Sequence, residues 1–258
     1  MITINNNSQY IKWIYQYHPH NLTENSPIPI LIANTVLSVL IGIVIWFNEV
    51  NISGPLVSLG LITTVFSFIL WFKDITIEGT FLGNHTKKVQ ESLSIGVSLF
   101  IVTEACVFLS VFWAYFHSSL SPTVELGTQW PPVSIVAISP MTIPLFNTLL
   151  LLSSGSTVTY AHHCIFNKDR SGAIIGLILT IILALVFTGF QAFEYIEAGF
   201  TISDGAYGSC FFFSTGLHGA HILVGSAFLI VGLVRLYYYH FTDIHHLGLE
   251  SSIVYWHL

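Results

Sequence analysis

Long apolar runs separated by polar connections set the pattern of this sequence. Each run is close to or longer than the roughly 20 residues with which an α-helix crosses a hydrocarbon core. Inside the runs the only Asp, Glu, Lys or Arg residues are Glu104 and Glu194. Since backbone N–H and C=O groups in lipid must bond within their own segment, the pattern predicts transmembrane α-helices. The runs cover residues 28–47, 54–72, 93–117, 141–165, 171–196 and 207–234.

The composition is that of an integral membrane protein. Hydrophobic residues make up 53% of the chain and charged residues only 8%, and the mean hydropathy is +0.74. In soluble domains roughly a quarter of all residues are charged. We therefore expect an all-α, polytopic transmembrane helical bundle over residues 28–258. It is preceded by an Asn-rich N-terminal extension, residues 1–27, which resembles neither a secretory signal nor a transit peptide.

The basic residues predict the orientation of this bundle. If the chain crosses at every run, all seven Lys and Arg residues fall on one face, and the connections 48–53, 118–140 and 197–206 on the other face contain none. By the positive-inside rule the basic face is the cytoplasm or, in an organelle, the matrix, and the N-terminus lies on that side. No basic cluster is dense enough to predict a nucleic-acid partner.

Small residues within the runs predict where helices approach one another. Helices in lipid associate closely where Gly, Ala, Ser and Thr let their backbones approach. We expect these positions to form contacts between helices, in preference to ligand sites. They are Ser153 to Ser156, Gly172, Gly176, Gly216, Gly219 and Gly225.

Glu104 is the strongest candidate for a functional residue. It stands near the middle of the 93–117 run, where a charged side chain costs at least ~2.5–3.5 kcal/mol. The carboxyl must therefore be protonated, paired or directed into a wet cavity. Two interpretations stay open from the residues alone: a neutral structural carboxyl bonded to a neighbouring helix, or a site on a proton pathway.

Histidine is the second candidate class, with twelve in the chain. His218 and His221 are three residues apart in the last run, so we expect them to project from the same helix face. Adjacent pairs occur at His162-His163 and His245-His246, both predicted at the basic surface. Paired histidines on facing helices can ligate haem or a metal. No run carries a Glu-x-x-His pattern, so hydrogen-bonded contacts between helices are the favoured interpretation.

Several longer motifs, in order along the chain, resemble subunit 3 of cytochrome c oxidase, the subunit III family of haem–copper oxidases. The resemblance covers the chain from about residue 50 to its C-terminus. The motifs are Phe112–Ser119, Gly127–Pro132, Pro144–Thr148, Tyr160–His163, Phe200–Ser209 and Thr215–His221.

This resemblance implies a seven-helix accessory subunit that holds no redox centre and no metal of its own. Haem and copper are then expected in partner subunits. The family packs on oxidase subunit 1, alongside subunit 2 and other subunits, and supports its stability during turnover and its proton uptake. It binds phospholipids in a V-shaped cleft between its first two helices and the rest. The catalytic activity, electron transfer to O2 coupled to proton translocation, belongs to the complex.

The resemblance also carries roles onto individual residues. Glu104 matches the family's buried carboxylate, and we expect a carboxyl–imidazole hydrogen bond to the sixth run, with His221 preferred over His218. A second group is expected around phospholipid headgroups, although Ile77 stands where relatives often carry Arg. This group is Lys73, Glu78, His85, Arg235, His240, His245 and His246.

The end of the sequence gives a further expectation. Relatives continue past the Tyr255-Trp256-His257 motif to finish a seventh helix, whereas the segment after His246 reaches only ~18 Å at helical rise, a little over half of a hydrocarbon core. We expect six full spans plus a partial seventh, completed by a separate polypeptide.

The predicted function is thus an accessory, lipid-binding subunit of a proton-translocating cytochrome c oxidase. The predicted location is the mitochondrial inner membrane, with a bacterial plasma membrane as the alternative. Two other classes compete with this function. An independent metal- or haem-binding membrane oxidoreductase would use His218, His221 and the His pairs. A transporter would show inverted repeats, and the sequence contains no internal repeat.

Overall fold

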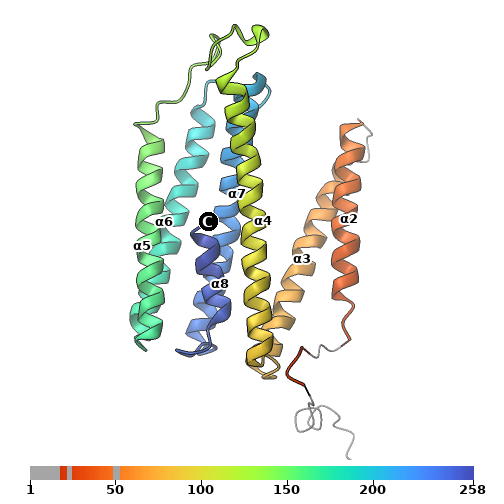
Figure 1. Cartoon of the computed structure of the whole chain (residues 1–258), viewed down its shortest axis with the longest axis vertical. Helices are drawn as coiled ribbons and strands as arrows, with labels where there is room; N and C mark the ends of the chain where they lie inside the picture. Colours follow the sequence, from red (N-terminus) through yellow and green to blue (C-terminus); the bar gives the residue numbers. More distant parts are fainter. Residues whose placement is uncertain (1–17, 22–24, 49–52) are drawn as a thin grey trace, which may run out of the picture. The chain divides into compact units, whose positions relative to one another are not determined.

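The computed structural model describes residues 18–21, 25–48 and 53–258 of the chain. Lys12 and most of the expected N-terminal extension lie outside the described residues. Every regular element in the described ranges is helical, which confirms the all-α class (Figure 1). The α-helices are α2 (Ile28–Phe47), α3 (Ser53–Thr80), α4 (Lys87–Leu120), α5 (Ile143–Phe166), α6 (Arg170–Glu197), α7 (Gly205–Tyr237) and α8 (Leu247–Trp256), and a 3-10 turn, η1, covers Val124–Leu126.

Five of these helices are long enough and apolar enough to cross a membrane, namely α2, α3, α4, α6 and α7. The predicted fourth span corresponds to α5, which has 24 residues but is not among the five. The polar run from Ser153 to Thr159 explains this, because it dilutes the apolar residues in the middle of the helix. Six full spans and a partial seventh therefore stay a prediction.

The helices extend beyond the apolar runs that predicted them. The segment 73–92 was expected to connect two spans outside the membrane, yet α3 continues to Thr80 and α4 begins at Lys87. With 34 residues, α4 is about 51 Å long at helical rise, more than a ~30 Å hydrocarbon core requires. Polar residues at such helix ends reach water, so a helix can extend beyond its apolar run.

The chain forms two compact units, Met1–Leu93 and Ser94–Leu258. In the first unit α2 and α3 pack as an antiparallel pair through glycines. A Cβ atom built on Gly42 would lie 2.7 Å from Val57 Cγ2, and one on Gly60 would lie 2.9 Å from Val39 Cγ2. Each glycine thus receives a valine of the other helix, which is the close approach expected for helices in lipid.

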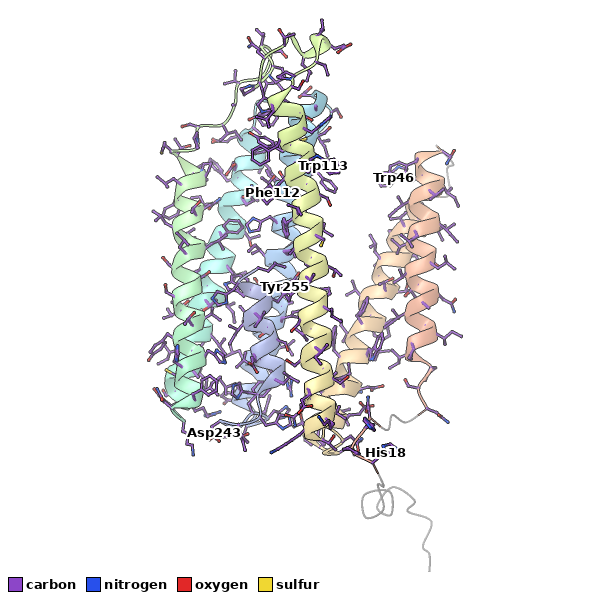
Figure 2. All side chains as sticks on the ribbon, viewed as in Figure 1. His18, Trp46, Phe112, Trp113, Asp243 and Tyr255 are labelled. Carbon is purple, nitrogen blue, oxygen red and sulfur yellow. The ribbon has the colours of Figure 1, made fainter. Side chains whose placement is uncertain are left out.

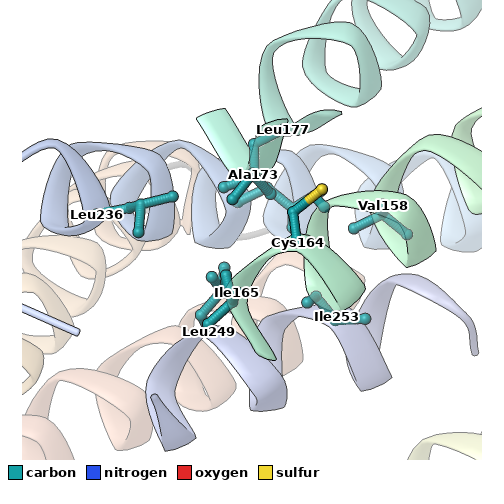
Figure 3. Close-up of a cluster of buried hydrophobic side chains, with 10 residues drawn as sticks. Val158, Cys164, Ile165, Ala173, Leu177, Leu236, Leu249 and Ile253 are labelled. Carbon is teal, nitrogen blue, oxygen red and sulfur yellow. The ribbon is translucent and has the colours of Figure 1, made fainter. Parts of the chain in front are cut away.

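In the second unit a buried core joins α5, α6, α7 and α8 (Figure 3). Its fully buried members include Val158, Leu177, Leu229 and Leu249. Small residues bring α5 and α6 together, because a Cβ on Gly176 would lie 2.8 Å from Ala161 Cβ. The glycine prediction is confirmed at this position, whereas a Cβ on Gly219 would meet nothing within 4 Å.

Candidate functional site

Glu104 and His221 form the central polar contact of the second unit. The carboxylate Oε2 of Glu104 on α4 bonds to Nε2 of His221 on α7. Their side chains are 21% and 16% exposed, so both groups lie largely out of solvent. The predicted carboxyl–imidazole hydrogen bond is confirmed, and its partner is the histidine that the sequence favoured.

The second ring nitrogen of His221 limits the ways in which one proton can be arranged in this contact. Nδ1 lies 2.8 Å from the backbone carbonyl oxygen of Leu217, which can only accept, so Nδ1 carries a hydrogen. In a neutral imidazole Nε2 is then a bare acceptor, and the hydrogen of the contact comes from a protonated Glu104. In the ionised form the same proton sits on Nε2. Either arrangement leaves the pair without net charge, and the proton can pass between the two groups.

Aromatic rings enclose this pair. The Phe108 ring centroid lies 4.9 Å from that of His221. The Tyr255 ring is stacked on His221 at 5.8 Å and on Phe100 at 6.0 Å. Figure 2 labels Tyr255 on α8. The sequence pattern does not predict that Tyr255 lies here, although the residue belongs to the Tyr255-Trp256-His257 motif.

His218 does not join the Glu104 contact. Its ring packs edge-on against Phe187 of α6, with centroids 5.7 Å apart. His218 and His221 nevertheless lie on adjoining parts of one helix face, as their spacing predicts. Three residues turn an α-helix by about 300°, so the two side chains point roughly 60° apart and meet different neighbours, α6 and α4.

The histidine pairs do not assemble a metal centre in the described part of the chain. The His162 and His246 rings meet at 5.7 Å, edge to face, and Nδ1 of His246 bonds to the carbonyl oxygen of Thr242. Among the described residues, no three His, Cys, Asp or Glu side chains gather as a metal ion would require. The independent metal- or haem-binding oxidoreductase is therefore not favoured.

The residues predicted around phospholipid headgroups fall in both units. In the first unit Lys73 and Glu78 lie in α3, and His85 lies in the connection to α4, where its carbonyl accepts from Gln90 Nε2 at 2.8 Å.

In the second unit the members of this group meet where α7 turns into α8. The His240 N–H donates to the Arg235 carbonyl at 3.0 Å, and the Thr242 N–H donates to the His245 carbonyl at 3.1 Å. Arg235 also lies over the Phe241 ring, with its Cζ 4.4 Å from the centroid. The gathering of all seven residues around lipid stays a prediction, as does the cleft.

Comparison with known proteins gives one consistent family. The sequence profile described as cytochrome c oxidase subunit III matches residues 18–258. The chain is 52% identical over 256 residues to cytochrome c oxidase subunit 3 of Mycosarcoma maydis, covering 97% of this chain and 93% of that protein. It is 54% identical over 242 residues to the subunit 3 of Rhizopus stolonifer, covering 94% and 86% respectively.

Proposed function

This chain belongs to the cytochrome c oxidase subunit III family, and we propose that it serves the oxidase as an accessory subunit that supports proton uptake without holding a redox centre. Membership of this family makes it a subunit of a multi-subunit respiratory complex. It acts as part of that complex, and the transfer of electrons to O2 takes place on haem and copper in partner subunits.

The Glu104–His221 pair carries this proposal. A carboxyl and an imidazole that share one proton inside a helical bundle are stable at membrane depth because they carry no net charge together. The same contact can accept or release a proton without moving a charged group through lipid. No residue of this contact needs a metal or a haem for that chemistry.

Partners and location follow from the family. We propose that the chain packs on oxidase subunit 1, near subunit 2, in the mitochondrial inner membrane, because the relatives above are fungal proteins. Its N-terminus and its basic connections would face the matrix. Phospholipid binding by Lys73, Glu78, His85 and the residues around Arg235 is part of the proposal.

Spectroscopy of the assembled complex and of the released chain tests this function. We expect the chain to purify with the haem-containing oxidase in fixed stoichiometry. After mild detergent release, the haem and copper spectra should stay with the remaining complex. A Soret band or a stoichiometric metal on the released chain would instead favour the independent oxidoreductase built on the histidines.

A further inference from the structure

A second group of buried polar side chains lies on two neighbouring helices, Asn147 on α5, and Gln191 and Glu194 on α6. Asn147 is 5% exposed and Glu194 is 6% exposed. Both amide atoms of Asn147, and Nε2 of Gln191, are buried and find no hydrogen-bond partner in the described part of the chain. A buried amide without a partner costs roughly 1–3 kcal/mol, so these three atoms require an explanation.

The helix register brings Asn147 and Gln191 to the same level, with Glu194 less than one turn further along α6. Thr157 and Thr180 bond across the two helices at 2.7 Å, and the rings of Phe146 and Phe190 meet at 5.1 Å. In an antiparallel pair of helices, moving forward by one residue on one helix moves the facing position back by one residue on the other. Continuing that register places Asn147 opposite Phe190, next to Gln191.

The buried stripes of both helices run into this cluster. On α5, Ala161, Ser154 and Asn147 follow one another at intervals of two turns, and all three are buried. Seven residues turn an α-helix by nearly two full turns, so they share a face.

On α6 the buried positions Thr180, Phe187 and Glu194 share the same spacing. Gln191 follows Leu177 and Ala184 on the adjoining stripe. Asn147 and Gln191 thus end the packed interface of α5 and α6, and Glu194 lies less than one turn beyond Gln191.

Neighbouring polar groups do not satisfy the cluster. The Tyr195 hydroxyl donates to Thr215 Oγ1 at 2.7 Å, and His218 packs on Phe187. Glu194 forms no ion pair with any described Lys or Arg. A carboxylate alone in lipid is costly, so the carboxyl is held protonated or solvated.

We propose that bound water molecules bridge Asn147, Gln191 and a protonated Glu194 in an internal polar site between α5 and α6. Polar groups that lie at one level without bonding directly are typical positions for a bridging water. A buried water makes two to four hydrogen bonds. The cluster offers an amide oxygen, two amide nitrogens and a carboxyl that can both donate and accept.

Infrared spectroscopy of the intact oxidase tests this site. A protonated carboxyl has a C=O stretching band, and its frequency rises when the carbonyl loses a hydrogen bond. We expect Glu194→Gln to remove one such band and Asn147→Leu to shift that band upward. Thr148→Val, a change at the exposed neighbour of Asn147, should leave it in place. Glu104→Gln shows whether the band belongs to Glu194 or to Glu104, because this change should leave the Glu194 band unchanged.

The unmodified complex gives an independent measurement. We expect a density map that resolves water to show density within hydrogen-bond distance of Asn147 and Gln191, and the Glu194 band to shift on exchange into heavy water. A direct Asn147–Gln191 hydrogen bond with no intervening density would overturn the proposal. So would an ionised Glu194, seen as the absence of any band sensitive to Glu194→Gln.

Discussion

The indole N–H of Trp256 on α8 donates to the hydroxyl oxygen of Ser154 on α5 at 3.1 Å. Ser154 is fully buried, and its own hydroxyl donates to the Leu151 carbonyl at 2.7 Å. The polar run that lowers the hydropathy of α5 is thus partly a docking surface for the last turn of α8. His257 adds to it, with Nε2 3.4 Å from Thr159 Oγ1.

Trp256→Phe tests this contact. The variant loses the N–H donor together with part of the packing on Gly225, where a Cβ would lie 2.9 Å from Trp256 Cε3, so we expect the subunit to lose at least about 0.5–1.5 kcal/mol of stability. A double-mutant cycle with Ser154→Ala, followed by thermal unfolding of the subunit in the complex, measures the coupling. Fully additive effects would show that the hydrogen bond contributes nothing.

Close packing of α7 on α8 gives a second prediction. A Cβ on Gly232 would lie 2.7 Å from Leu249 Cδ1, and Leu249 is fully buried in the core. We expect Gly232→Ala to destabilise the subunit by about 1–3 kcal/mol, because an overpacked core must shift. Gly219→Ala is the matched control on the same helix, since a Cβ there meets nothing within 4 Å. Equal unfolding midpoints for the two variants would contradict the prediction.

Arg170 closes the C-terminal end of α7. Its Nη2 donates to the Tyr237 carbonyl at 2.7 Å and its Nε to the Leu236 carbonyl at 3.3 Å. Its Cζ lies 3.9 Å from the centroid of the Tyr239 ring. A planar guanidinium makes these contacts together, whereas an ammonium group cannot.

We therefore expect Arg170→Lys to cost the subunit about 1–2 kcal/mol of stability, although the charge is retained. Thermal unfolding of the complex, monitored by loss of this subunit, measures the change. The control is Lys168→Ala, because the Lys168 ion pair with Asp243 spans 3.3 Å at a side chain that is 75% exposed. An exposed pair contributes little, so a larger loss for Lys168→Ala would contradict this account.

The sequence was most informative where a single physical constraint decides the outcome. The run 28–47 coincides with α2, and 171–196 lies within a residue of α6 at each end, because lipid requires long helical segments of apolar residues. The cost of a charge in lipid likewise singled out Glu104 and its imidazole partner.

Side-chain direction and the packing between helices could not be predicted from the sequence. The roughly 60° between His218 and His221 decides which helix each one meets, and no pattern fixed the rotation of α7. The position of Tyr255 beside His221, and the unsatisfied amide of Asn147, depend on the register between helices that are distant in sequence. These features follow from packing, which a one-dimensional pattern does not specify.

The final prediction concerns the shared proton of Glu104 and His221. In Glu104→Gln the amide N–H can still donate to Nε2 of His221, so the hydrogen bond survives, but the proton can no longer pass between the two groups. We expect assembly and haem spectra to be unchanged and subunit stability to change by less than about 1.5 kcal/mol. Proton uptake, or the durability of the oxidase during turnover, should fall.

Proton uptake and the decay of activity during sustained turnover measure this effect in the assembled oxidase. Glu91→Gln is the matched control, because it removes a carboxylate from the same helix at a side chain that is 59% exposed and forms an ion pair with Lys88. Glu104→Leu should cost more stability than Glu104→Gln, roughly 1–3 kcal/mol, since it leaves Nε2 of His221 buried without a donor. Loss of the haem spectrum in Glu104→Gln, or an equal effect of Glu91→Gln on proton uptake, would show that the pair has no specific role in proton supply.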